Sequence, residues 1–252
     1  PHLPFIAPKK YWDLYDRNDI SLPYNNFFPP SAPKKANYFY EIRKFTDIPD
    51  EGPITDSKAK ELIHAYYACV SYIDAQIGLI LDELDNQGLT NNTTVVLTSD
   101  HGFSLSEHGR WTKHNLFQYE LKIPMIISSP KYKKNKTSES FVELVDLYPT
   151  FCEIAGLEIP SFAQGKSLID NLKNPKKITN DIAFSRWQNG ETLISNKYYY
   201  TEWSRKGNLT HRMLYDIEND ELQMNNIAEI KSEKSIVDSL SSILNKHIKS
   251  IN

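Results

Sequence analysis

The sequence has 252 residues, enough for one large domain or two small ones, and its 40% hydrophobic content permits a sizeable core. Its 29 basic and 32 acidic residues leave a net charge of −3, which argues against nucleic acid as a partner. The two cysteines, Cys69 and Cys152, exclude a disulfide-rich scaffold and match no metal-ligand spacing, so both are expected to be buried thiols.

The start of the chain, PHLPFIAPKK, has no methionine and no charged segment followed by an apolar one, so it does not have the pattern of a signal peptide. We interpret the chain as a processed or partial polypeptide. No apolar run approaches the roughly 18 residues that a membrane span needs, and no membrane partner is expected.

The first half of the chain predicts an irregular segment followed by an α/β unit. Residues 1–55 are rich in proline and aromatic residues, which indicates a long irregular excursion over a surface. Apolar residues recur at helical spacing from 62 to 84, which predicts a helix with Asp56 as its N-cap and Gly88 at its end. The run 93–99, TTVVLTS, predicts a strand buried on both faces, as in a mainly parallel sheet.

The second half changes in character near residue 166. Before that point, an apolar run at 123–128 predicts another strand, and a helix is expected that Gly156 ends. After it, three aromatic-rich runs separated by turn residues predict a small antiparallel sheet: 181–187, 197–203 and 212–217. Apolar residues four positions apart then predict a closing amphipathic helix: Ile236, Leu240, Leu244 and Ile248.

Residues 98–115, TSDHGFSLSEHGRWTKHN, concentrate titratable side chains directly after the first predicted strand. Asp100 and His101 stand at the C-terminal end of that strand, the edge at which open α/β sheets bind ligands. They can ligate a metal together, or Asp100 can cap the next turn with His101 packed beside it. Lys113 can supply fixed positive charge to an anionic substrate. His108 is expected to order the loop by hydrogen bonds.

This segment resembles the second signature region of the sulfatases, and it is most similar to the iduronate-2-sulfatase-like members. Ser106 stands where the family usually has a glycine. Three further segments resemble the same family in the family's order, so the resemblance extends over nearly the whole chain. They are PHLPFIAPKKYWDLY, VELVDLYPTFCEIAGLEIP and LYDIENDELQMNNIAE, the last with Glu221 in place of a proline.

The resemblance implies a partial alkaline-phosphatase-like α/β fold, with a mainly parallel sheet flanked by helices. Residues 1–165 would form the C-terminal part of the sulfatase catalytic domain, and residues 166–252 a small α+β subdomain with an antiparallel sheet and a closing helix. The implied activity is hydrolysis of sulfate esters in sugars or polysaccharides. The implied compartment is periplasmic, secreted or lysosome-like.

The resemblance also assigns roles residue by residue. Asp100 and His101 match positions that bind a single divalent cation, typically calcium. Lys113 matches the lysine that contacts the sulfate, and His2 matches the histidine near the leaving-group oxygen. These roles are chemically coherent, since a cation and a lysine stabilise charge on the sulfuryl oxygens while a protonated histidine serves the departing alkoxide.

The nitrogen ligand of His101 leaves a second enzyme class open. Calcium prefers oxygen ligands, whereas imidazole suits zinc or manganese. The Asp–His pair is therefore also compatible with metal-dependent phosphoesterases and phosphonate hydrolases of the same superfamily. The Trp-x-Lys sequence and the single Asp–His pair favour a sulfatase, and a folded but non-catalytic module is the third alternative.

The nucleophile of the family is not found in this sequence. Sulfatases use a formylglycine made in a Cys-x-Pro-Ser-Arg-like motif, and neither Cys69 nor Cys152 lies in one; the family's N-terminal Asp-Asp metal pair is also missing. We therefore expect the formylglycine on an N-terminal half that is a separate chain, lost by processing, or missing from a fragment. Aromatic residues are expected to wall the substrate cleft: Phe27, Phe28, Phe103 and Trp111.

Overall fold

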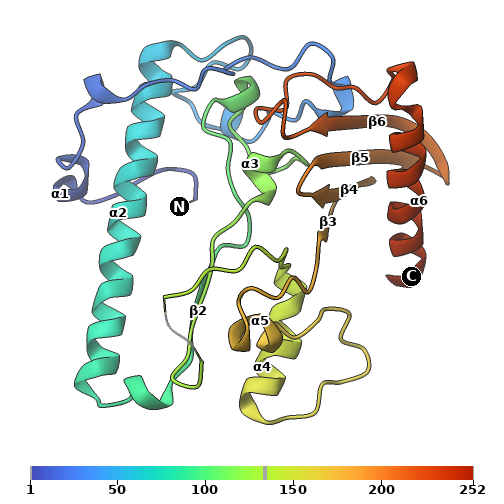
Figure 1. Ribbon diagram of the computed structural model, residues 1–252. Coiled ribbons are helices and arrows are strands. Elements are labelled where there is room, and N and C mark those ends of the chain that lie inside the picture. Colours follow the sequence, from blue (N-terminus) through green and yellow to red (C-terminus); the bar gives the residue numbers. More distant parts are fainter. Residues whose placement is uncertain (1, 133–134, 252) are drawn as a thin grey trace.

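The computed structural model describes residues 2–132 and 135–251. Its longest element is helix α2 (Asp56–Asn86), which stands along one side of the molecule (Figure 1). Thr55, rather than Asp56 as predicted, is the N-cap, because its hydroxyl accepts a hydrogen bond from the Lys58 N–H at 3.3 Å. Gly88 follows the last turn with φ +66°, in agreement with the predicted end of the helix.

Only the N-terminal part of α2 is covered by other elements. Its buried residues lie between Ala59 and Cys69, where the short helix α1 (Lys9–Trp12) and the irregular first segment pack against it. Farther along the helix, Ile73 and Ile80 are 48% and 69% exposed. The irregular segment therefore covers a surface as predicted, and the rest of α2 presents apolar side chains to solvent.

Strands β1 (Val95–Thr98) and β2 (Met125–Ser128) pair antiparallel, so the prediction of a mainly parallel sheet does not describe this pair. A parallel pair needs a crossover connection, usually a helix. The chain between these strands contains only the four-residue helix α3 (Gln118–Leu121) and a loop. The predicted burial of both faces is also wrong, since Leu97 and Ile126 are 38% and 56% exposed.

The second sheet has four antiparallel strands in the order β3–β4–β5–β6, which confirms the small sheet predicted for the C-terminal part. Tight turns join each strand to the next. Strand β4 has no aromatic residue, and the sequence pattern does not reveal it. The strands are β3 (Ile182–Trp187), β4 (Gly190–Ser195), β5 (Tyr198–Arg205) and β6 (Asn208–Asp216).

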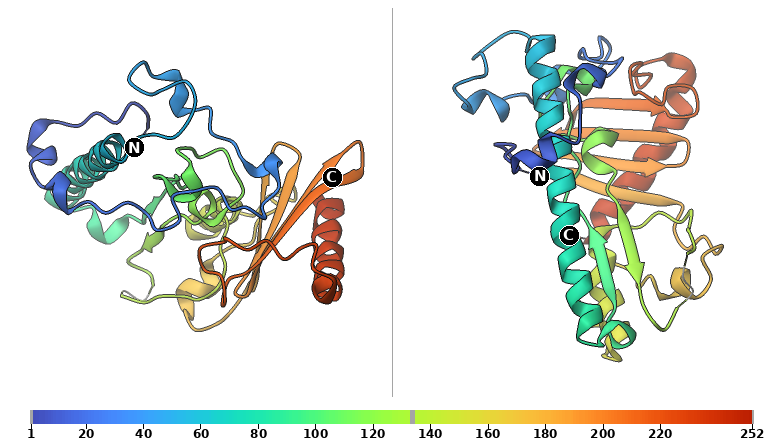
Figure 2. Two further views of the ribbon diagram at one scale, coloured as in Figure 1. Left: turned by 90° about the horizontal axis from the view of Figure 1, so that it is seen from above. Right: turned by 90° about the vertical axis from the view of Figure 1, so that its left-hand side faces the viewer.

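Both faces of the four-stranded sheet are covered. The closing helix α6 (Lys234–Ile251) packs on one face, as predicted, and runs along the sheet in Figure 2. Successive side chains of a strand point to opposite faces. Leu214 therefore packs toward α6, whereas Tyr215 packs with Leu116 and Phe117 on the other face. The loop that carries the predicted site residues is thereby held against the sheet.

Helices α4 (Leu147–Ala155) and α5 (Ile169–Lys173) lie together at the end of the molecule that holds β1 and β2 (Figure 1). Gly156 ends α4 with φ +72°, as predicted. The division of the chain at residue 165 stays a prediction. Among the described residues, no helix has the length and apolar character needed to cross a membrane.

Candidate active site

The loop after β1 enters the site through a close backbone contact at Gly102. The Gly102 N–H donates a hydrogen bond to the Glu120 carbonyl at 2.8 Å, and a Cβ at this position would lie 2.0 Å from the Tyr119 carbonyl oxygen. Only glycine permits that approach. The turn is therefore held against α3, with Asp100 and His101 at the end of β1.

A buried ion pair supports the middle of the same loop. Arg110 Nη2 lies 3.2 Å from Glu120 Oε1, and neither side chain has any exposed surface. His108 is also buried, and its Nε2 lies 2.7 Å from the Leu222 carbonyl oxygen. This contact confirms the prediction that His108 orders the loop. Burial, with the nearby Arg110 charge, lowers the pKa of His108 to about 4, so its imidazole is neutral at neutral pH.

Lys113 lies at the centre of a cluster that joins three distant parts of the sequence. Its Nζ is 3.0 Å from His2 Nε2 and 2.5 Å from Glu41 Oε1. The Lys113 and Glu41 side chains are only 15% and 11% exposed. The fold thus brings Lys113 and His2 together and adds Glu41, which sequence analysis missed. Glu41 stands in the irregular first segment, where neither periodicity nor a motif marks it.

Burial and charge together set the protonation of this cluster. Burial by itself raises the pKa of the Glu41 carboxyl, but the hydrogen bond and charge of Lys113 and the charge of His114 outweigh it and lower that pKa. Burial lowers the pKa of His114, against the opposing effect of Glu41. At neutral pH the cluster therefore contains an ionised Glu41 beside Lys113, with a neutral His114 next to them.

Asp100 and His101 lie side by side, with Asp100 Oδ2 3.6 Å from His101 Nε2. His101 Nδ1 lies 2.6 Å from the Gly102 carbonyl oxygen, which can only accept, so Nδ1 carries a hydrogen and Nε2 is the nitrogen with the lone pair in the neutral imidazole. A carboxylate and a bare imidazole nitrogen that face each other suit a cation between them. Within residues 2–132 and 135–251, no group of three or more such ligands is found.

Asp100, His101 and Lys113 line one open cavity of about 660 Å³. The opposite wall comes from β3 of the four-stranded sheet and includes Phe184 and Trp187. The structure thus places the predicted metal pair and the predicted sulfate-binding lysine around a common space. His2 does not itself line this cavity but contacts Lys113, which does.

The aromatic residues predicted to wall the cleft do not line this cavity: Phe27, Phe28, Phe103 and Trp111. Trp111 is only 4% exposed and packs in a core cluster with Ile42 and Ile63. Phe103 meets the Phe5 ring edge-on, with ring centroids 5.7 Å apart. Some of these residues are near Lys113 in sequence. The loop reverses direction between α2 and the sheet, so neighbouring side chains point to different parts of the molecule.

Neither cysteine fits the nucleophile of a sulfatase. Cys69 is buried within α2 and Cys152 within α4, both as free thiols, which confirms their predicted burial. Burial raises the pKa of the Cys69 thiol, which keeps it protonated. Neither residue lines the cavity.

Comparison with known sequences gives a family for most of the chain. The sulfatase family profile matches residues 1–157, and a profile described as N-sulphoglucosamine sulphohydrolase, C-terminal, matches residues 106–250. A sulfatase from Formosa agariphila is 30% identical over 98% of this chain and 48% of its own length. Iduronate 2-sulfatase from Mus musculus is 32% identical over 64% of this chain and 35% of its own length. The chain thus spans about half, or less, of these relatives.

Solved structures agree on the fold. A protein in complex with D-glucosamine-2-N,6-O-disulfate matches with a TM-score of 0.84 at 22% identity, over 100% of this chain and 64% of that one. A phosphonate monoester hydrolase from Silicibacter pomeroyi matches with a TM-score of 0.87 at 23% identity, over 100% of this chain and 55% of that one. These likenesses confirm the predicted alkaline-phosphatase-like fold class. The sulfatase family profile over residues 1–157, more than half of the chain, shows that the chain belongs to the sulfatase family.

Proposed function

We propose that this chain supplies one half of the active site of a sulfatase that cleaves sulfate esters of a sugar or polysaccharide. The observation that carries this proposal is that Lys113 lines one cavity with Asp100 and His101 and contacts His2 at 3.0 Å. Relatives named for sulfated sugars, such as an N-acetylglucosamine-6-O-sulfatase from Bacteroides thetaiotaomicron, support the substrate class. The family resemblance favours a periplasmic, secreted or lysosome-like compartment.

Negative charge develops on two groups in sulfate ester cleavage, and Lys113 and His2 each act on one of them. Lys113 donates to sulfuryl oxygens, whose negative charge grows in the transition state. His2 Nδ1 lies 2.6 Å from the Leu3 carbonyl oxygen and so carries a hydrogen, while Nε2 accepts from the Lys113 ammonium. When Lys113 turns its N–H toward sulfate, Nε2 is free to bind a proton and to donate it to the leaving oxygen.

Asp100 and His101 would hold a divalent cation, which when bound supplies further positive charge to the sulfuryl oxygens. The Asp100 side chain is 85% exposed and free to accept a cation, and the hydrogen bond to Gly102 leaves His101 Nε2 as a ligand. The family resemblance favours calcium, whereas the imidazole ligand favours zinc or manganese. Glu41 keeps Lys113 oriented by the 2.5 Å contact described above.

The remaining ligands and the formylglycine would come from an N-terminal sulfatase half, as a separate chain or as another part of the same polypeptide. Two apolar surfaces support this partner: the β1–β2 pair, where Ile126 is 56% exposed, and the far part of α2, where Ile80 is 69% exposed. Both lie at the same end of the molecule (Figures 1 and 2). Uncovered apolar strands and helices of this extent mark an interface.

The test is to produce the chain with an upstream half that contains Cys-x-Pro-Ser-Arg and to measure hydrolysis of 4-nitrophenyl sulfate and of an alkyl sulfate. Lys113→Ala should lower kcat/KM about a hundredfold or more, because a donor to the transition state is lost. Lys122→Ala, which removes an exposed lysine outside the cavity, is the matched control. Asp100→Ala should lower the content of bound calcium measured by elemental analysis.

His2 has its own diagnostic within the same experiment. If His2 protonates the leaving oxygen, His2→Ala should harm alkyl sulfate hydrolysis far more than that of 4-nitrophenyl sulfate, since nitrophenolate leaves without a proton. Equal losses on both substrates would refute the acid role. Unchanged calcium in Asp100→Ala would refute the metal assignment.

A second candidate function is hydrolysis of phosphonate or phosphate esters. The likeness in fold to phosphonate monoester hydrolases from Silicibacter pomeroyi and Agrobacterium radiobacter favours it, with TM-scores of 0.87 and 0.82. Turnover of a phosphonate monoester with zinc or manganese bound, and none of sulfate esters, would establish this alternative. Cation binding with no turnover of either ester would indicate a non-catalytic module.

A further inference from the structure

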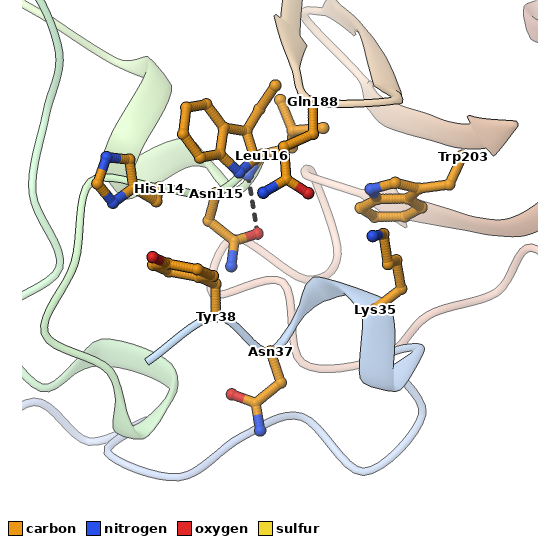
Figure 3. Close-up of a pocket in the computed structure, with 9 residues that line it drawn as sticks. Lys35, Asn37, Tyr38, His114, Asn115, Leu116, Gln188 and Trp203 are labelled. Atoms are coloured by element: carbon orange, nitrogen blue, oxygen red, sulfur yellow. Dashed lines mark hydrogen bonds between the residues drawn. The ribbon is translucent and has the colours of Figure 1, made fainter. Parts of the chain in front are cut away.

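A second, smaller pocket opens beside the active-site cavity. It has a volume of about 80 Å³, and His114, Asn115 and Trp187 line both spaces. Lys35 and Gln188 line only the smaller pocket (Figure 3). Because the two spaces share a wall, a ligand held at Lys113 can continue into the second pocket along the protein surface.

Three polar side chains of this pocket have no hydrogen-bond partner within the described part of the chain, whereas Asn115 bonds to the backbone. The Lys35 ammonium, the Gln188 amide and the Tyr38 hydroxyl make no side-chain hydrogen bond or ion pair there. Figure 3 shows the Gln188 amide directed toward Asn115 and the Lys35 amino group beside the Trp203 ring. None of the described residues that line the pocket is acidic, so Lys35 gives it a positive potential.

Gln188 also adopts an unfavourable backbone conformation. Its φ is +53°, in the left-handed region, within the tight turn between β3 and β4. Glycine, asparagine and aspartate are the usual residues at such turn positions. A strained non-glycine residue that carries an unpartnered amide at a pocket points to a role for that side chain.

Flat aromatic surfaces form the wall between the pocket and the cavity. The His114 ring stacks on Trp187, with centroids 4.6 Å apart and an interplanar angle of 21°. Tyr38 meets His114 edge-on at 5.3 Å and 87°. Aromatic faces bordered by a few polar groups are suited to a pyranose ring, whose C–H face is apolar and whose hydroxyls need donors and acceptors.

We infer that this pocket binds an acidic group, a carboxylate or a sulfate, on the sugar unit next to the one whose ester is cleaved. The inference rests on the proposed sulfatase function, since it places the cleaved ester at Lys113. A volume of about 80 Å³ holds several waters, which is room for an exocyclic anionic group. The sugar ring itself would lie on the wall formed by His114 and Trp187. The substrate would therefore be an acidic oligosaccharide rather than a neutral sugar sulfate.

The direct test is equilibrium binding followed by tryptophan fluorescence, because Trp187 and Trp203 line the pocket. The probes are an unsulfated uronic acid–N-acetylglucosamine disaccharide, the same disaccharide with its carboxyl reduced to an alcohol, and the reduced form with a sulfate on that unit. At least one anionic form should bind roughly tenfold or more tightly than the reduced form, as expected for a charged hydrogen bond. The anionic probe that binds more tightly than the reduced form shows whether the pocket takes a carboxylate or a sulfate.

Two lysine variants give the matched comparison. Lys34 and Lys35 are adjacent in the same short helical turn (Lys34–Ala36), both are exposed, and only Lys35 lines the pocket. Lys35→Gln should abolish most of the preference for the anionic probe, and Lys34→Gln should preserve it. Gln188→Gly, which removes the amide and relaxes the backbone, should weaken binding of all three probes. Equal affinities for the three probes would overturn the proposal. So would an equal loss of the preference for the anionic probe in both lysine variants.

Turnover separates this inference from the proposed function. If the assembled protein hydrolyses 4-nitrophenyl sulfate but Lys35→Gln leaves the kcat/KM ratio of acidic to reduced sulfated disaccharides unchanged, the pocket assignment fails and the sulfatase stands. If no sulfate ester is hydrolysed while the binding preference and its loss in Lys35→Gln persist, the proposed function fails and the acidic-sugar site stands.

Discussion

Replacing Glu120 by glutamine should destabilise the protein strongly, because it removes the carboxylate that pairs directly with the buried Arg110. Both side chains are fully buried and their closest atoms are 3.2 Å apart. Arg110 also donates to the Ala36 carbonyl at 3.3 Å, and Glu120 accepts from the Ser104 hydroxyl. Glutamine keeps the size of the side chain and one acceptor oxygen, so the change removes charge and little else.

The expected loss follows from this geometry. Two unit charges 3.2 Å apart attract by about 5 kcal/mol at the effective dielectric constant of roughly 20 that suits protein sites. The amide oxygen that remains restores about 1.5 to 3 kcal/mol as a hydrogen bond to a charged donor. The free energy of unfolding should therefore fall by about 2 to 3.5 kcal/mol, which overlaps the range of about 3 to 5 kcal/mol seen when a buried pair loses one partner.

The assay is urea denaturation followed by tryptophan fluorescence and circular dichroism. The matched control is Glu229→Gln, because Glu229 pairs with Arg212 at 2.8 Å but is 71% exposed, and its loss should cost less than about 1 kcal/mol. The double variant Arg110→Met/Glu120→Leu should lose less stability than Glu120→Gln. A loss below about 1 kcal/mol in Glu120→Gln would refute the view that Arg110 depends on this carboxylate.

Acidification should destabilise the protein through His108, whose pKa of about 4 lies below the ordinary 6.5. The unfolded imidazole binds its proton first, so stability is complete above pH 6.5 and falls by about 3 kcal/mol as the pH drops toward 4. His108→Asn, which tolerates the φ of +53°, should flatten this slope in urea titrations across that window, and parallel slopes would exclude His108 as the cause. Gly102→Ala should cost about 2 kcal/mol or more, because its Cβ would meet the Tyr119 carbonyl at 2.0 Å. Gly78→Ala, with nothing within 4 Å in α2, should instead be neutral or stabilising; equal thermal shifts in both would contradict the packing argument.

Local pattern alone determined several parts of this protein. The regular apolar spacing of α6 and the aromatic runs of β3, β5 and β6 identify their elements, because helix and strand periodicity depends on neighbours in sequence. The order of charged residues after β1 likewise marked Asp100, His101 and Lys113 as a candidate site. These residues follow one strand within a short stretch, so their proximity needed little long-range information.

Only the tertiary structure decided what surrounds that stretch. Glu41 joins Lys113 across 72 positions of sequence, and His2 joins it across 111, contacts that no local pattern encodes. The cavity wall belongs to β3 rather than to Trp111, because packing against the core under α2 turned that indole inward. The antiparallel pairing of β1 and β2 depends in the same way on how the chain returns between them. Side-chain direction and strand partnership arise from contacts between distant segments, and sequence periodicity cannot specify them.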